Sequence, residues 1–118
     1  MTVLVIPGTP PPSLNRQERL HWAVRRRLRQ EWASFAWAAW LKAGRPRFKR
    51  PSVTVRLYYP TKRRRDPDNA MAAVKPILDG LKGHAFPDDD SKTIRLAVEI
   101  DSDREQPRVE IVLEEVAT

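Results

Sequence analysis

Apolar residues recur at every third or fourth position over a long stretch near the start of this chain, a period that predicts an amphipathic helix. The stretch begins after Ser13 or Asn15, either of which is a suitable helix cap, and continues to about Lys42. Its apolar positions should form one buried stripe, and they are Leu20, Val24, Leu28, Trp32, Phe35 and Ala39.

A second stretch with the same period covers residues 67–81 and predicts a second helix. Pro76 lies inside it and should kink it, because proline removes a backbone hydrogen bond. Gly80 is expected to mark the fraying end of this helix.

Four further segments have the composition or the two-residue alternation of strands, namely 2–7, 53–59, 94–100 and 109–113. The last two are joined by a polar turn, 102–107, which predicts a β-hairpin. The resulting order is β-α-β-α-β-β, which predicts an α+β fold with a mixed sheet and helices packed on one face. No repeat or linker divides the chain, so residues 1–118 are expected to form a single small domain.

The distribution of charge is more informative than the net charge of +7. Residues 1–65 hold 16 Lys/Arg and 2 acids, whereas residues 66–118 hold 6 Lys/Arg and 13 acids. One interpretation is that the two halves fold together and neutralise each other. The other is a basic surface that binds phosphates beside an acidic pocket that binds a cation.

The sequence also excludes several classes of protein and site. It has no cysteine, so no disulfide or Cys-ligated metal is available. It shows no signal peptide and no apolar segment long enough for a bilayer, so no membrane partner is expected and a cytoplasmic location is favoured.

Two acidic motifs are the candidate chemical site. Asp66-Pro67-Asp68-Asn69 stands at the start of the second predicted helix, with Asp66 as its cap, and Asp88-Asp89-Asp90 precedes a predicted strand. Each motif alone has an ordinary structural interpretation, as helix capping or as a solvated turn. Together they favour a shared site, because a helix start and a strand start can bring their acids to one edge of a sheet.

An all-carboxylate site favours Mg²⁺, with Mn²⁺ as a substitute, over zinc. Directly before Asp66 stands a run of four cations, Lys62, Arg63, Arg64 and Arg65. Cations that hold phosphates beside a metal-binding acid pair are what phosphodiester cleavage requires. A solvated basic loop is the alternative interpretation of this run.

These motifs resemble the RusA-type Holliday junction resolvases, which combine D-x-D-N at a helix start, a helical lysine and a D-D pair before a later strand. The early Pro12-Ser13-Leu14-Asn15 and the element order are also similar, so the resemblance covers nearly the whole chain. It implies that Asp66, Asp68 and Asp90 are catalytic, metal-binding carboxylates. It also implies a Mg²⁺-dependent homodimer, of bacterial or phage origin, that nicks two opposed strands of a four-way DNA junction.

The chain departs from the family at one position. The family's catalytic lysine lies four residues after the second Asp of D-x-D-N, and Ala72 occupies that place here. Lys75 is one helical turn further along the same face, roughly 10 Å from Asp68, and is either a functional replacement or the partner of Asp79 in a helix ion pair.

The sequence therefore predicts an endodeoxyribonuclease that resolves four-way junctions in DNA recombination and repair, without an organic cofactor. Its catalytic residues would be Asp66, Asp68, Asp90 and Lys75, and DNA would be gripped by the 62–65 run together with Arg25 and Arg26. Two alternatives remain open. One is a non-catalytic module that binds branched DNA, and the other is a metal nuclease that acts on flaps or RNA.

Overall fold

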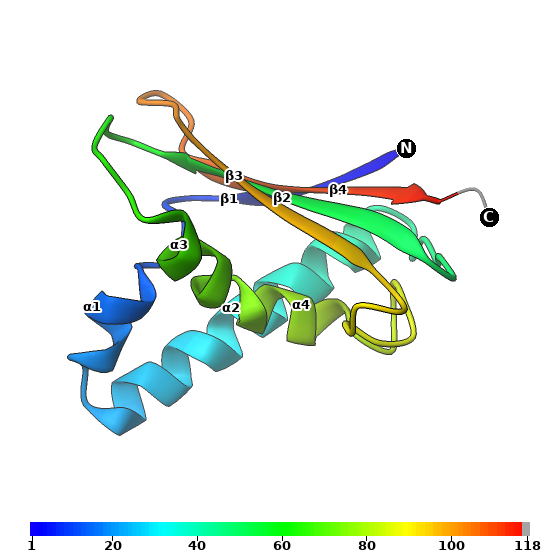
Figure 1. The fold of residues 1–118 in the computed structure, drawn as a ribbon, viewed down its shortest axis with the longest axis horizontal. Helices are drawn as coiled ribbons and strands as arrows, with labels where there is room; N and C mark the ends of the chain where they lie inside the picture. Colours follow the sequence, from blue (N-terminus) through cyan, green and yellow to red (C-terminus); the bar gives the residue numbers. More distant parts are fainter. Residues whose placement is uncertain (117–118) are drawn as a thin grey trace.

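The computed structural model of the chain describes residues 1–116, and the side chains of Leu14 and Asn15 lie outside that description. Its elements, in chain order, are β1 (Thr2–Pro7), α1 (Leu14–Glu18), α2 (Trp22–Lys42), β2 (Pro51–Tyr59), α3 (Pro67–Ala73), α4 (Lys75–Leu81), β3 (Arg95–Ser102) and β4 (Arg108–Glu115). The strands form one sheet, and the helices lie together on one of its faces (Figure 1). The predicted α+β class, the mixed sheet and the one-sided helical layer are therefore confirmed.

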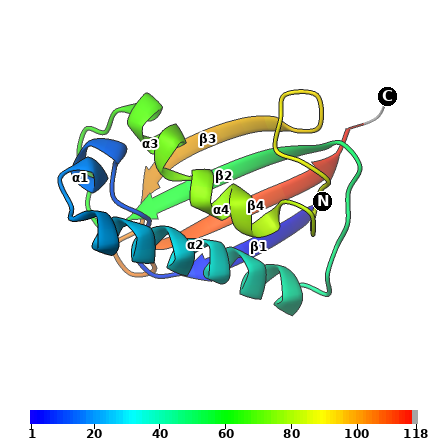
Figure 2. The same cartoon turned by 90° about the horizontal axis from the view of Figure 1, so that it is seen from below.

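The sheet has the order β1-β4-β2-β3, which differs from the predicted pairing of the last two strands. β4 is antiparallel to both β1 and β2, whereas β3 pairs with β2 in parallel. The predicted β3–β4 hairpin is therefore wrong, because β2 lies between these two strands (Figure 2). The alternating pattern fixes which face of a strand is buried, but it does not choose the strand's neighbour.

The connection between β3 and β4 has to cross the end of β2. A crossing of one strand spans roughly 10 Å, which a five-residue loop can bridge. The backbone N–H of Asp103 donates to the carbonyl of Tyr59 at 2.8 Å, and this bond ties the loop to the end of β2. Arg108 donates to the Asp103 carboxylate at 2.7 Å and closes the loop.

The first predicted helix is broken into α1 and α2. Ser13 caps α1 by accepting a hydrogen bond from the N–H of Arg16 at 3.4 Å, and the alternative cap Asn15 lies outside the described side chains. A second cap, His21, starts α2, because its Nδ1 accepts a hydrogen bond from the N–H of Ala23 at 3.2 Å. The end of α2 at Lys42 is as predicted.

The buried stripe predicted for this helix is only partly buried. Trp32 and Ala39 are in the core, but Val24 is 47% exposed and Phe35 is 45% exposed. The first apolar positions, Leu20, Val24 and Leu28, line an open groove, and of these Leu28 also packs against the core. The hydrophobic period therefore runs on beyond the part of α2 that the sheet covers.

The second predicted helix is also divided, at Val74, into α3 and α4. Pro76 lies in the first turn of α4, so the predicted interruption by this proline is confirmed. The prediction that Gly80 marks a fraying helix end is wrong. It is buried inside α4, and a Cβ built on it would lie 2.2 Å from the carbonyl oxygen of Ala33 in α2.

The core fills the space between the sheet and these helices. The buried side chains of the central strands are Val53, Val55, Leu57, Val109, Ile111 and Leu113, and those of the helices include Trp32, Trp40, Ile77 and Leu81. Each strand therefore turns its apolar set toward α2 and α4, as the alternation predicted.

Gly80→Ala should lower the free energy of unfolding by about 2 kcal/mol, measured by urea denaturation. The added methyl group collides with the backbone of α2, and overpacking of this kind costs about 1–3 kcal/mol or more. The intrinsic helix preference for alanine, about 1 kcal/mol, opposes the loss without cancelling it. Ser34→Ala, at an exposed position of α2, should change stability by less than about 0.5 kcal/mol. A Gly80→Ala variant as stable as the parent would show that the α2–α4 contact is looser than described.

Candidate active site

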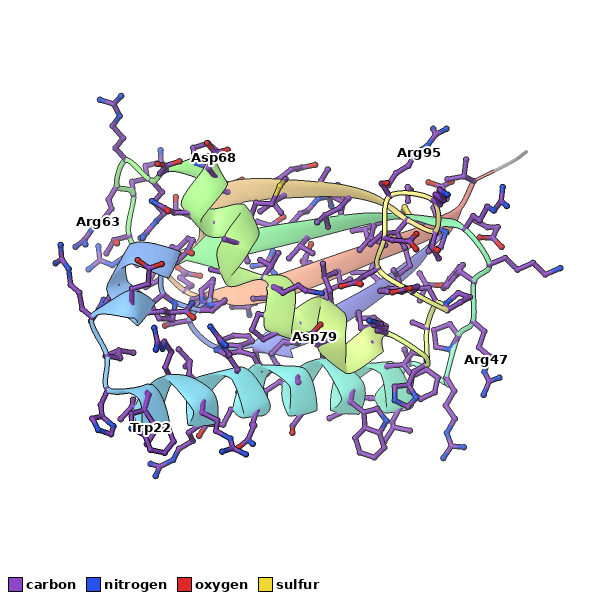
Figure 3. All side chains as sticks on the ribbon, turned by 60° about the horizontal axis from the view of Figure 1, so that its bottom comes forward. Trp22, Arg47, Arg63, Asp68, Asp79 and Arg95 are labelled. Carbon is purple, nitrogen blue, oxygen red and sulfur yellow. The ribbon has the colours of Figure 1, made fainter. Side chains whose placement is uncertain are left out.

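The first acidic motif forms the start of α3. Asp66 is the N-cap, Pro67 occupies the first turn, and Asp68 follows within that turn, as predicted. The Asp66 carboxylate accepts hydrogen bonds from the N–H of Asp68 at 2.9 Å and from the side-chain amide of Asn69 at 3.3 Å. Asp66 is thus held by the helix start, whereas Asp68 is exposed and directed to one side of it (Figure 3).

A shallow groove beside α3 and α4 is lined by one acid from each motif. Asp68, Ala72 and Lys75 line it from the helices, and Asp89 and Leu96 line it from the far side. Ala72, which stands where the family has a lysine, opens directly onto this groove. The short side chain at position 72 therefore leaves Lys75 as the one cation among the lining residues of this groove.

Lys75 contributes the ammonium group of this groove. Its Nζ lies 3.0 Å from the Asp79 carboxylate and also pairs with the carboxylate of Asp89. The Lys75–Asp79 ion pair expected from the sequence is confirmed, and the contact with Asp89 is an addition that the sequence did not predict. The hydrogen bond to Asp89 raises the pKa of Lys75, and the same bond lowers the pKa of Asp89.

The three consecutive aspartates have three different environments. Asp89 has a side chain only 11% exposed, and Lys82 approaches it at 3.8 Å while lying 3.3 Å from Asp88. Asp90 points into its own turn, where Oδ1 accepts hydrogen bonds from the N–H groups of Lys92 and Thr93. The hydrogen bond from the Thr93 side chain is the main cause of the lowered pKa of Asp90. Asp89, and not Asp90, is the member that enters the groove.

The structure does not gather Asp66, Asp68 and Asp90 into one cluster. Within residues 1–116, no group of three Asp, Glu, His or Cys side chains is placed to hold a metal ion. The α3–α4 segment runs opposite in direction to β3, so the start of α3 lies toward the end of β3 and away from its beginning (Figure 2). Among the described residues of the two motifs, Asp68 and Asp89 line one groove, whereas Asp66 and Asp90 do not line it.

The basic run lies in the loop between β2 and α3. Arg65 is partly buried, with its guanidinium 3.5 Å from the centre of the Tyr59 ring. The Tyr59 hydroxyl donates to the carbonyl of Pro11 at 3.2 Å, and burial raises its pKa, an effect that Arg65 partly offsets. Lys62, Arg63 and Arg64 are exposed, as a surface for phosphates requires.

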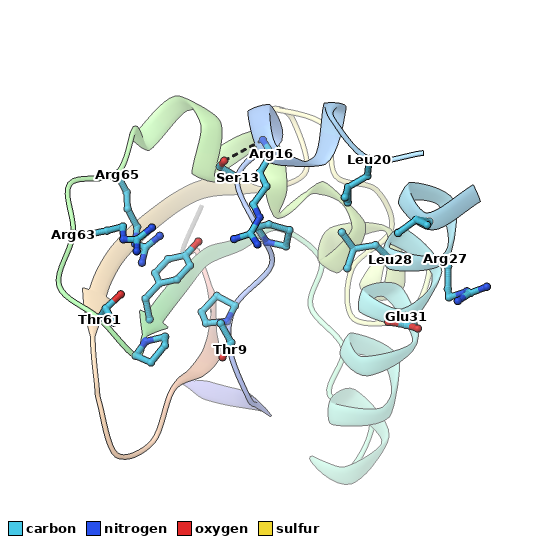
Figure 4. Close-up of a pocket in the computed structure, with 15 residues that line it drawn as sticks. Thr9, Ser13, Arg16, Leu20, Arg27, Leu28, Glu31, Thr61, Arg63 and Arg65 are labelled. Carbon is cyan, nitrogen blue, oxygen red and sulfur yellow. Dashed lines mark hydrogen bonds between the residues drawn. The ribbon is translucent and has the colours of Figure 1, made fainter. Parts of the chain in front are cut away.

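The arginines of the long helix are arranged differently from the prediction. Arg25 is partly buried and Arg26 is exposed, but neither lines the groove in front of the basic loop. Arg16 and Arg27 line it, together with Arg63 and Arg65 (Figure 4). Helical spacing alone could have placed Arg27 beside Leu20 and Leu28, since positions 20, 24, 27 and 28 share one face.

The chain matches the family model described as "Endodeoxyribonuclease RusA" over residues 7–114 of its 118 residues. The chain belongs to the RusA endodeoxyribonuclease family. It is therefore a member of a family of nucleases that act on Holliday junctions, and DNA is a partner of this chain. A search of curated proteins returned no match. In residues 1–116 no helix combines the length and apolar character needed to cross a membrane.

Lys75→Met should raise the pKa of Asp89 toward its ordinary value of 3.8, measured by NMR titration of the carboxyl carbon. The pair stabilises the fold between the lowered pKa of Asp89 and the raised pKa of Lys75. Its contribution is lost as the pH falls through the Asp89 value or rises through the Lys75 value. The stability difference between parent and variant should therefore shrink below about pH 4. Lys42→Met, at an exposed position of α2, should leave the titration of Asp89 unchanged, and an unchanged pKa in Lys75→Met would refute the ion pair.

Proposed function

We propose that this chain is a Mg²⁺-dependent endonuclease that resolves four-way DNA junctions by paired nicks. The observation that carries the proposal is the groove lined by Asp68, Asp89 and Lys75 in a RusA family chain. Asp68 follows Arg65, the last cation of the basic loop, by three residues. The groove supplies carboxylates and an ammonium group at one place. The loop supplies cations for the neighbouring phosphates.

The donor set of this groove suits Mg²⁺. This ion is commonly held by one or two carboxylates, with waters and substrate phosphates completing its coordination, so a third protein ligand is not required. Asp68 and Asp89 would be those two carboxylates. Of the other ligands that the resemblance implies, Asp66 lies two residues before Asp68 and Asp90 directly follows Asp89. When bound, the ion would polarise the scissile phosphate and lower the pKa of the attacking water, and Mn²⁺ would serve as a substitute.

The remaining residues of the site bind and orient the substrate. Arg63 and Arg64 offer exposed guanidinium groups to the DNA backbone, and the guanidinium of Arg65 is fixed on the Tyr59 ring. Lys75 would donate to an oxygen of the reacting phosphate, in the role for which the family uses a lysine at the position of Ala72. Its raised pKa keeps it protonated throughout the physiological range.

We also propose that the active form is a homodimer. A single site makes one nick, and resolution of a four-way junction requires two nicks related by symmetry, which a dimer with a twofold axis provides. The proposed place of action is the cytoplasm of a bacterial cell, where chromosomal or phage DNA is accessible.

A second candidate function is a branched-DNA-binding module that has lost cleavage. It is favoured by Ala72 and by the engagement of Lys75 with two carboxylates in the groove. A flap- or RNA-directed nuclease is the third alternative, and comparison of junction, flap, duplex and RNA substrates separates it from the first.

Asp68→Asn should abolish Mg²⁺-dependent cleavage of a synthetic four-way junction and retain binding of that junction. The substitution removes a carboxylate that faces the groove and leaves the basic loop intact. Cleavage is followed on denaturing gels, and binding by mobility shift in Ca²⁺. The matched control is Glu114→Gln, which removes one negative charge from an exposed position near the end of β4 and should leave cleavage unchanged.

Two results would contradict the proposal. Undiminished cleavage by Asp68→Asn would exclude this groove as the catalytic site. Binding without nicking by the parent chain, across a series of Mg²⁺ and Mn²⁺ concentrations, would establish the non-catalytic module instead.

A further inference from the structure

A second groove lies between the α1–α2 region and the basic loop, and the cleavage proposal leaves its shape unexplained (Figure 4). It has a volume of about 590 Å³, which is within the range of sites that take small organic ligands. One wall comes from the start of α2 and the residues before it. The other wall comes from the end of β2 and residues 61–65.

Arginines stand on both walls. Arg16 and Arg27 belong to the helical wall, and Arg63 and Arg65 belong to the loop wall. Glu31 is the single acid among the lining residues, so the groove carries a strong positive charge. Arg16 lies between the two walls, near Arg63 and Arg65, whereas the side chain of Arg27 extends from the outer side of α2 (Figure 4). Guanidinium groups distributed along a groove in this way suit a chain of phosphates that follows it.

The helical wall is also apolar, which a phosphate site does not require. Leu20 precedes α2, and Val24 and Leu28 lie one turn apart within it. Val24 is exposed in the groove, whereas Leu28 lines the groove and also packs against the core. Val24 is 47% exposed. An uncovered apolar face between arginines is complementary to a ligand that has an apolar ring and a phosphate, as a nucleotide does.

The loop wall is held in place by buried contacts. Arg65 lies on the Tyr59 ring, and the Tyr59 hydroxyl donates to the carbonyl of Pro11, which joins the loop to the segment before α1. This hydrogen bond thus connects the two walls at the bottom of the groove. Arg65 also directly precedes Asp66, so the groove leads to the start of α3 and the first acids.

We propose that this groove binds an unpaired nucleotide of the DNA substrate. Its base lies against Leu20, Val24 and Leu28, and its flanking phosphates contact the arginines of the two walls. In a junction, such a nucleotide would come from the strand near the crossover, and seating it would direct that strand toward Asp68. This last step rests on the proposed function, whereas the nucleotide site itself does not.

The test compares binding of three DNAs by four variants. The DNAs are a dT oligonucleotide, a duplex of equal length and a four-way junction, all in Ca²⁺. Val24→Asn is paired with Val5→Asn, since both valines are 47% exposed and Val5 lies on β1 away from the groove. Arg27→Gln is paired with Arg29→Gln, which removes the same charge from an exposed α2 position that does not line the groove.

Val24→Asn should weaken binding of the oligonucleotide and the junction at least about fivefold, and should leave duplex binding within about twofold. Val5→Asn should change none of the three. Arg27→Gln should weaken oligonucleotide binding about tenfold, clearly more than Arg29→Gln does. Circular dichroism verifies folding, and the arginine pair carries the test if Val24→Asn is unfolded.

The nucleotide site is overturned if Val24→Asn binds every DNA as the parent does, or if it weakens all three alike. It is also overturned if Arg27→Gln and Arg29→Gln are equivalent. Junction cleavage by the parent chain is measured in parallel and reports on the proposed function. If the parent chain cleaves junctions but the variants do not differ from their controls in DNA binding, only the nucleotide site is refuted. If the variants differ as expected but the parent chain does not cleave, only the proposed function is refuted.

Discussion

The parallel pairing of β2 with β3 is the constraint on which the position of the candidate site depends. Two adjacent parallel strands cannot be joined by a tight turn. The chain therefore leaves the sheet at Tyr59, crosses one face of it, and re-enters at Arg95, which lies beside Ser52 at the other end of β2. The basic loop, α3, α4 and the acidic turn all belong to this one crossover. The crossover is held on the sheet by its buried apolar side chains and on α2 by the close approach at Gly80. The charged groups of the site are therefore carried by the connection that the sheet topology makes necessary.

Within the crossover, positive and negative charges are concentrated in different segments. The arginines come first, outside the sheet's end, and the acids follow on α3 and in the turn before β3. Lys75 links α4 to Asp89 and thereby draws the acidic turn toward the helices. In the proposed complex, Asp89 would bind the metal ion and Lys75 would bind the phosphate. Each side chain would thus exchange part of its present ion pair for a contact with a ligand. Solvent screens opposite charges in an exposed groove, so separating such an ion pair costs little free energy.

The sequence predicts the parts of this structure that depend on local periodicity and capping. The boundaries of β1, the end of α2, the Asp66 cap and the interruption at Pro76 all follow from residue type and spacing. The family was identified from the two acidic motifs, and the match over residues 7–114 confirms it. What local reasoning missed are contacts between distant segments. Three examples are the β2–β3 pairing, the Gly80–Ala33 approach and the Lys75–Asp89 pair. In each case the local sequence would fit a different partner equally well. The exposure of Val24 belongs to the same class, because a period shows that a helix has an apolar face without showing what covers it.

We propose that Asp68 and Asp89, which come from opposite ends of the crossover and line one groove, bind one divalent cation between them. Paramagnetic line broadening by Mn²⁺ tests this claim directly on ¹⁵N-labelled protein, since broadening falls steeply with distance from the ion. The account predicts that substoichiometric Mn²⁺ broadens the amide signals near Asp68 and those near Asp89 together, and that excess Mg²⁺ restores both. Broadening confined to one of the two segments, or concentrated elsewhere on the molecule, would contradict it.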